Sequence, residues 1–296
     1  MSKVTKRIKR RLPLVGIFLL LLLGFAVFMY PIVSNWLQSY TARTEISSYD
    51  KTIQKMGNAA IRTAEKNAQQ YNLSLNDSNK KSELDYDEVL AVTEAIGYIE
   101  IPKIGVYLPI YHGFSDEVLQ KGVGHMEGTS LPIGGESTHS VLSGHTGLPS
   151  AELFTDLDLL KQGDAFYIHV LDKVLKYEVD QIKIVLPSDT SDTRIIEGGD
   201  YVTLLTCTPY GINSHRLLVR GERVPYATQT MENTNPWPVV HASEKKVPVR
   251  TIAWYASAAV IGFVVLSILM ILLFPGRRRR KDKKKDHQTP ENISSG

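Results

Sequence analysis

The chain contains a single cysteine, Cys207, which follows the apolar run 203–206 and precedes a turn-rich hexapeptide. A thiol can act as a nucleophile when a proton carrier and an oxyanion donor stand beside it. A lone cysteine is also commonly a small buried side chain. Cys207 by itself therefore leaves two interpretations open, a structural thiol and a reactive one, and the residues around it must decide.

An arginine stands where it could serve such a thiol. Residues 201–206 and 216–220 are rich in Val, Leu and Thr, which favours strands. If these strands are neighbours, Cys207 and Arg216 lie at the same end of a sheet, where a guanidinium favours the thiolate and can donate to an oxyanion. The alternative for Arg216 is a surface ion pair. His215 adjoins it, but strand neighbours point to opposite faces, so His215 is the weaker candidate base.

The stronger candidate base is His145, one of eight histidines in the chain. It lies between Gly144 and the pair Thr146-Gly147, directly after a short predicted strand. A strand that opens into a glycine-flanked turn exposes a side chain at the rim of a sheet, although a solvated loop histidine has the same surroundings. Thr206 and Ser143, which lie close to Cys207 and His145 in sequence, are candidates for contacting a substrate.

The central part of the chain alternates short strands with turns. The candidate strands are rich in Val, Ile, Tyr and Leu and are separated by Gly, Pro and Asp. Their number and length predict a closed or nearly closed β-barrel. In the fifth strand the alternation slips near Asp180, which predicts a bulge. The candidate strands are 97–101, 106–111, 139–143, 165–171, 174–185, 201–206 and 216–220.

A helix is predicted before the barrel, over residues 46–72. Apolar residues recur there at three- and four-residue spacing, and Ser47 or Ser48 could cap its start. The apolar stripe is weak, so the helix is expected to pack on the barrel from outside. The polar residues 73–85 predict a loop.

Both ends of the chain carry apolar stretches beside basic tails. Residues 14–33 include twenty positions without a charge, and residues 252–274 include twenty-three. About twenty apolar residues span a hydrocarbon core of roughly 30 Å, and basic flanks remain cytoplasmic. We therefore expect a transmembrane helix at each end, both termini in the cytoplasm and the central domain outside. The first stretch could instead be a cleaved signal peptide.

The charge distribution argues against nucleic-acid binding. Residues 1–12 carry six positive charges and residues 277–296 carry a net charge of five, whereas the whole chain has a net charge of +3. The part between the tails is therefore acidic, and a basic balance confined to membrane flanks does not indicate a nucleic-acid partner.

The sequence resembles a known family at three motifs. "TLLTC" at 203–207 matches the TLxTC signature of sortases, and Arg216 is placed as that family places its arginine. Residues 143–164 resemble the sortase segment around the active histidine. Residues 213–224, with an anchor at each end, are similar to class C sortases, the pilin polymerases. The resemblance covers residues 95–225. Residues 40–95 and the two anchors agree with the family only in the type of segment they form.

This resemblance implies a membrane-bound cysteine transpeptidase of a Gram-positive bacterium, with an eight-stranded β-barrel. Its substrates are proteins that carry an LPxTG-like sorting signal. Cys207 attacks the carbonyl of the signal's threonine, His145 protonates the leaving glycine amine and then deprotonates the incoming amine, and Arg216 holds the substrate and steadies the oxyanion. In class C the incoming amine is a pilin lysine, so the product is an isopeptide-linked fibre.

Two further expectations concern what the chain lacks. Class C sortases often carry a lid with an Asp-Pro-aromatic motif, and no such triplet precedes the barrel. Asp85 and Tyr86 are the candidate remnant, and an open cleft is expected. His112, His125 and His139 lack the spacing of a zinc site, and no phosphate-binding glycine loop is present, so we expect no metal and no cofactor.

Two other functions remain open from the sequence. One is a housekeeping sortase that attaches proteins to a cell-wall precursor. The other is a non-enzymatic, membrane-tethered β-barrel adhesin or scaffold with a buried cysteine.

The expected organisation is a basic tail at 1–12, a membrane helix at 13–34, a helical or lid-like region at 35–95, a catalytic barrel at 96–226, a linker at 227–250, a membrane helix at 251–274 and a basic tail at 275–296.

Overall fold

The computed structural model of the protein describes residues 3–76, 84–148, 151 and 153–226. The predicted linker over 227–250 and the predicted C-terminal membrane helix over 251–274 lie outside these residues.

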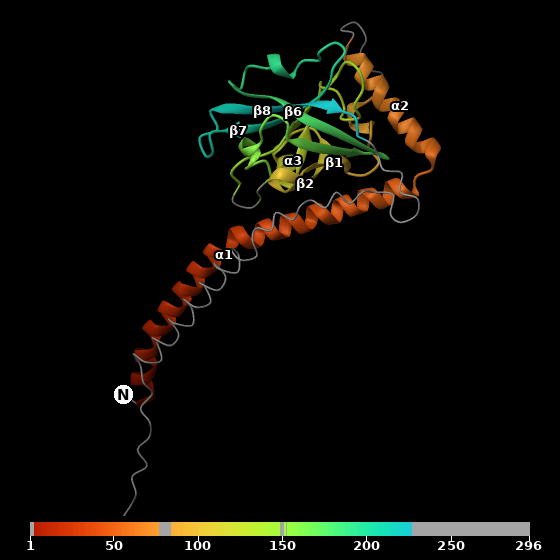
Figure 1. Ribbon diagram of the computed structural model, residues 1–296. Coiled ribbons are helices and arrows are strands. Elements are labelled where there is room, and N and C mark those ends of the chain that lie inside the picture. Colours follow the sequence, from red (N-terminus) through yellow and green to blue (C-terminus); the bar gives the residue numbers. More distant parts are fainter. Residues whose placement is uncertain (1–2, 77–83, 149–150, 152, 227–296) are drawn as a thin grey trace, which may run out of the picture. The chain divides into compact units, whose positions relative to one another are not determined.

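Eight strands form a closed barrel in the order β1-β2-β3-β4-β7-β8-β6-β5. Figure 1 shows the barrel with β1, β2, β6, β7 and β8 labelled. The pairs β2–β3 and β4–β7 are parallel, and the other neighbours are antiparallel. The predicted closed β-barrel is therefore confirmed. The strands are β1 (Ala95–Ile101), β2 (Val106–His112), β3 (Val123–His125), β4 (Thr138–Ser143), β5 (Ala165–Val170), β6 (Lys173–Val185), β7 (Asp200–Thr208) and β8 (His215–Val224).

Only one of these strands was not predicted. Strand β3 is three residues long and contains a glycine, so it shows neither alternation nor a run of β-branched residues. Its pairing comes from tertiary contacts, because it lies between β2 and β4 and closes the barrel there.

The predicted bulge in β6 is also confirmed. The register with β8 shifts between Val179 and Gln181 and leaves Asp180 unpaired. The Nε of Arg220 donates to both Asp180 carboxylate oxygens at 3.1 Å, which holds the bulge in place. Beyond the bulge, β6 continues along β8 as far as Arg216.

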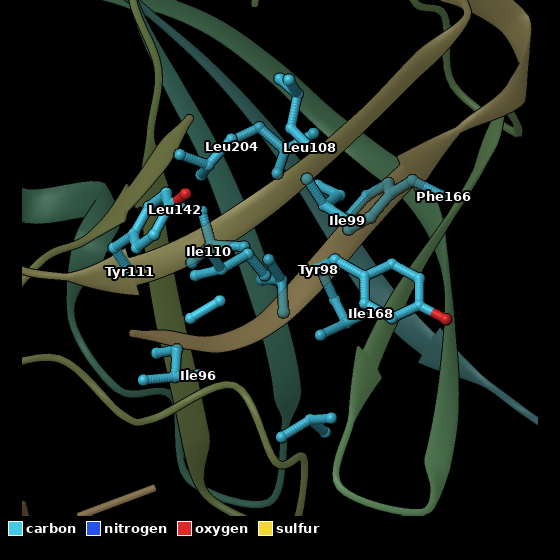
Figure 2. Packing of buried hydrophobic residues seen from close by; sticks show 14 of the residues in the cluster. Ile96, Tyr98, Ile99, Leu108, Ile110, Tyr111, Leu142, Phe166, Ile168 and Leu204 are labelled. Carbon is cyan, nitrogen blue, oxygen red and sulfur yellow. The ribbon is translucent and has the colours of Figure 1, made fainter. Parts of the chain in front are cut away.

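The barrel interior is filled by side chains from alternate positions of the strands, as a small closed barrel requires. The rings of Phe166 and Tyr177 stack there with their centroids 5.5 Å apart. Full burial of one Val, Leu, Ile or Phe side chain stabilises a fold by about 1.5–3 kcal/mol. Figure 2 shows part of this cluster, including Ile99, Leu108, Ile110, Leu142, Phe166, Ile168 and Leu204.

Two helices precede the barrel, α1 (Lys3–Lys55) and α2 (Asn58–Leu75). The prediction that residues 46–72 are helical is confirmed except at Met56 and Gly57, whereas the predicted start with a cap at Ser47 or Ser48 is wrong. Helix α1 runs past residue 46 to Lys55, and Gly57 caps α2 in an extended conformation.

Within the described residues, one helix is long and apolar enough to cross a membrane. It is the part of α1 from Leu19 to Lys55. The same features suit a signal sequence near the N-terminus.

Both helices pack on the outside of the barrel, as expected. The Tyr49 hydroxyl of α1 donates to the Ile96 carbonyl at 3.2 Å and accepts from the Leu171 amide at 2.7 Å. The Asn72 side chain of α2 exchanges two hydrogen bonds with the backbone of Leu131. These contacts tie α1 to β1 and α2 to the segment between β3 and β4.

A buried histidine lies at the end of β3. His125 is fully buried, and its Nδ1 lies 2.8 Å from the Tyr86 hydroxyl. Its Nε2 lies 2.9 Å from the Ser130 carbonyl, so Nε2 carries the proton and the neutral ring is satisfied at both nitrogens. Burial lowers the pKa of His125 to about 4.

We predict that acidification weakens the fold through this histidine. Between pH 6.5 and pH 4 the unfolded chain binds a proton at residue 125 and the folded chain does not, so the free energy of unfolding falls by up to about 3 kcal/mol. Urea unfolding of the full-length protein in detergent, followed by circular dichroism at several pH values, measures this loss.

The control is the variant His125→Gln, which cannot titrate but can still donate to Ser130. Burial also lowers the pKa values of His112 and His139, so the variant should keep part of the pH dependence. A slope identical to that of the wild type would contradict the assignment to His125.

Candidate active site

Cys207 lies one residue before the end of β7. Its thiol is free and half-buried, so it is neither cross-linked nor sealed in the core. Pro209 follows two positions later and, lacking an amide proton, cannot continue the ladder of β7. The chain turns there through residues 209–214 and enters β8.

Arg216 is the cross-strand partner of Cys207 in the antiparallel pair of β7 and β8. Directly opposed residues of such a pair point to the same face, with Cβ atoms about 4.5–5.5 Å apart. The Arg216 Nη1 donates to the carbonyls of Asn213 at 3.2 Å and His215 at 3.1 Å. Among the described residues no carboxylate pairs with Arg216, so a surface ion pair does not explain it there.

His145 reaches the same end of the barrel from β4, which runs parallel to β7. The last pair in this register is Ser143 with Leu205, and two residues further along each chain stand His145 and Cys207. The pairing continues past the strand, because the Gly144 amide donates to the Leu205 carbonyl at 3.0 Å and the Thr206 hydroxyl donates to the Gly144 carbonyl at 2.7 Å. The backbone at His145 is thereby held beside that at Cys207.

The segment after His145 is held from its other side as well. The Phe154 amide donates to the His145 carbonyl at 3.0 Å, and the buried Phe154 ring packs directly on Gly144. A Cβ on Gly144 would lie 2.6 Å from that ring, so this position must be glycine if Phe154 is to close over it.

The two candidates for substrate contact are both buried. Thr206 is 3% exposed and uses its hydroxyl to hold Gly144, so its observed role is to position the turn that carries His145. Ser143 is 8% exposed and lies between Gly124 of β3 and Leu205 of β7. Neither side chain projects freely from the rim.

Asp85 and Tyr86 lie apart from these residues. Asp85 caps the short 3₁₀ helix η1 (Tyr86–Glu88), and the Tyr86 hydroxyl contacts His125 and accepts from the Gly113 amide. Those contacts are at the carboxyl ends of β2 and β3. In register, His125 pairs with Leu142 and Leu142 with Leu204, three positions before Cys207. The Tyr86 hydroxyl therefore contacts β3 and the end of β2, and not the side chains of Cys207 or Arg216.

His215 neighbours Arg216 but belongs to the other face of β8. Its register partner is Thr208, and its Nδ1 lies 2.9 Å from the Ser214 hydroxyl. The alternation of strand side chains therefore separates His215 from the face that Cys207 and Arg216 share.

Two contacts at this end of the barrel were not predicted. Phe154 packs on Gly144, and the ring of Tyr210 packs on Gly147. The sequence carried a partial signal, since two glycines flank His145 closely, but it gave no indication of which rings would cover them.

The arrangement suits acyl transfer. The register opposes Cys207 to Arg216. Hydrogen bonds between Gly144 and the Leu205–Thr206 segment hold the backbone before His145 at the same end of the barrel. A thiolate can attack a carbonyl, an imidazole can carry the proton of the leaving amine, and a guanidinium can bind the oxyanion.

Comparison with known proteins agrees with this chemistry. The Sortase domain family matches residues 99–224. Sortase D of Bacillus subtilis is 34% identical over 134 residues, which are 44% of this chain and 65% of that protein, just under two thirds of its length.

Two solved structures are similar to this chain over their whole length. Sortase C-1 of Streptococcus pneumoniae is 48% identical with a TM-score of 0.57, covering 62% of this chain and 100% of that one. Sortase C of Clostridium perfringens, solved with the C-terminal cell wall sorting motif, is 50% identical with a TM-score of 0.58, and the coverage is again 62% and 100%.

The fold and the match over whole solved chains define the class: the chain belongs to the sortase family of cysteine transpeptidases. Its solved relatives at 48% and 50% identity are sortases of class C.

Proposed function

We propose that this protein is a pilin-polymerising sortase in which Cys207, His145 and Arg216 carry the reaction. The observation that supports it best is the register that opposes Cys207 to Arg216 while the parallel pairing of β4 and β7 brings His145 alongside. The similarity to a sortase C of Streptococcus pneumoniae described with pilin substrate specificity, and to a pilus-related sortase C of Group B Streptococcus, supports the pilin as client. The lysine acceptor follows from the resemblance to the pilin polymerases.

The first half of the reaction cleaves the sorting signal. The Cys207 sulfur attacks the threonine carbonyl carbon of an LPxTG-like motif, and the Arg216 guanidinium donates to the carbonyl oxygen as it becomes negative. The threonine–glycine C–N bond then breaks, and His145 delivers a proton to the leaving glycine amine. The enzyme is left with a thioester on Cys207.

The second half joins two subunits. A lysine amine of another pilin attacks the thioester carbon, and His145 accepts its proton. The C–S bond breaks, Cys207 is regenerated and an isopeptide bond links the two chains. Attack by water at the same carbon would only release the substrate, so a polymerase must admit the amine in preference to water.

The proposal includes the placement at the membrane. The N-terminal apolar part of α1 fits an anchor, and sortases are membrane-associated proteins of Gram-positive bacteria. We propose that the barrel lies outside the cell with both termini inside, held by the apolar stretches 14–33 and 252–274. Protease protection of both tails in intact protoplasts tests this topology.

A covalent adduct tests the chemistry. The full-length protein, purified in detergent, is mixed with an LPxTG-type peptide, and its intact mass is measured. The wild type is expected to gain the mass of the peptide up to its threonine, whereas Cys207→Ala should gain none. An unmodified wild type, or an equal adduct on Cys207→Ala, excludes the mechanism.

The acceptor separates a pilin polymerase from a housekeeping sortase. The preformed thioester is offered either a lysine-bearing pilin domain or an amine that mimics a cell-wall precursor. Faster transfer to the lysine is expected, and preference for the cell-wall amine would favour the housekeeping function.

A thiol that forms no adduct and resists alkylation in the folded protein would point to the non-enzymatic scaffold.

A further inference from the structure

The loop between β7 and β8 touches the turn that carries the candidate base. The Tyr210 ring lies against Gly147, two residues after His145, and a Cβ built on Gly147 would be 2.9 Å from the ring's Cε2 and 3.2 Å from its Cζ. Gly147 has a φ of +76°, which favours glycine. The ring therefore rests directly on the glycine backbone.

The same loop also positions the candidate arginine. The Arg216 guanidinium donates to the Asn213 carbonyl, three residues after Tyr210 in the same loop. One end of the loop thus contacts the turn that follows His145, and the other end binds the guanidinium of Arg216, the register partner of Cys207. The loop therefore contacts the segments of both His145 and Arg216.

We infer that Tyr210 is a positioning residue, which couples the turn of His145 to the loop of Arg216 across Cys207. This inference rests on the proposed function. Tyr210 is 67% exposed, so little of the fold's apolar burial depends on it. An exposed tyrosine seated on a left-handed glycine beside the candidate base fixes geometry more than it contributes to stability.

The contact involves the ring and not the hydroxyl. The atoms of Tyr210 nearest to Gly147 are Cε2, Cζ and Cδ2, which phenylalanine also has. Tyr210→Phe should therefore keep the coupling, and Tyr210→Ala should lose it. Misplacing a proton carrier slows the chemical step more than it weakens substrate binding.

The test compares steady-state kinetics of the full-length variants in detergent with an LPxTG-type peptide and an amine acceptor. Tyr210→Ala is expected to lower kcat about tenfold with KM for the peptide nearly unchanged, and Tyr210→Phe to restore most of kcat. Ile212→Ala is the matched control, because Ile212 is 71% exposed and lies in the same loop. It should behave as the wild type.

Three outcomes would overturn the inference. Tyr210→Ala could match the wild type, it could raise KM alone, which marks a substrate contact, or Tyr210→Phe could be as slow as Tyr210→Ala, which marks a role of the hydroxyl. If the wild type forms no thioacyl adduct at all, the proposed function fails instead.

A stability cycle tests the contact without turnover. Gly147→Ala introduces a methyl group that meets the Tyr210 ring, so its cost in thermal stability should be smaller in the Tyr210→Ala background than in the wild type. The backbone strain at Gly147 is common to both backgrounds and cancels. Strictly additive losses would show that the ring does not rest on Gly147.

Discussion

Replacing His145 with alanine is expected to lower the turnover number for transpeptidation about a thousandfold. General acid–base catalysis by a positioned histidine contributes roughly 10²–10⁴-fold to a rate. Here the imidazole must protonate the leaving amine and deprotonate the incoming one, so both halves of the cycle slow. Turnover with an LPxTG-type peptide and an amine acceptor, measured across a pH series, records the loss.

The matched control is His215→Ala. His215 carries the same imidazole, adjoins Arg216 in sequence and belongs to the opposite face of β8. It should retain activity within a few-fold of the wild type, since it does not share the face of Cys207. Comparable losses in the two variants, or a larger one for His215→Ala, would reassign the base.

Replacing Arg216 with lysine is expected to lower kcat/KM about a hundredfold, and replacing it with alanine somewhat more. Removing one oxyanion donor costs about 10²–10³-fold. Lysine keeps the charge but carries only three donors on one nitrogen, so binding the Asn213 and His215 carbonyls would leave one donor in place of the planar guanidinium fork. Single-turnover formation of the thioacyl adduct measures the first half of the cycle directly.

Arg220→Lys is the control for that variant. Arg220 lies on the same strand and face as Arg216, two alternations further along, but its guanidinium is bound to Asp180 at the bulge. We expect reduced stability with adduct formation close to that of the wild type. Full activity of Arg216→Lys would show that charge alone suffices, and the oxyanion role assigned to the fork would be abandoned.

Much of the barrel could be predicted from sequence because its strands are short, apolar and bounded by Gly, Pro or Asp. Even the bulge was predictable, since the alternation of β6 changes phase around Asp180. Strand β3 was not, because three residues including Gly124 carry no period and depend on β2 and β4 for their pairing.

The helical region shows a different limit. The stripe that includes Ile53 predicted helix correctly but not where the helix begins, because a cap-competent serine inside a continuing helix looks the same in sequence as one at its start. Gly57 was the real boundary, and the buried partners of Tyr49 in α1, Ile96 and Leu171, lie 47 and 122 residues further along the chain.

For the candidate site, adjacency of β7 and β8 could be expected from a single loop between them. The placement of His145 beside Cys207 could not, because it depends on a parallel pairing of β4 with β7 that no local pattern encodes. The contacts of Tyr210 and Phe154 with glycines could not be predicted either. A glycine allows another group to approach closely, but the sequence does not show which group does so.

The parallel pairing of β4 with β7 also bears on when the protein becomes reactive. Parallel pairs between distant segments are slow to form, because the intervening chain must be ordered before the contact repays the cost. Under the proposed mechanism, Cys207 lacks its proton carrier until that pairing is made. Transpeptidase activity, as distinct from ordinary thiol reactivity, would then mark a molecule whose barrel is complete.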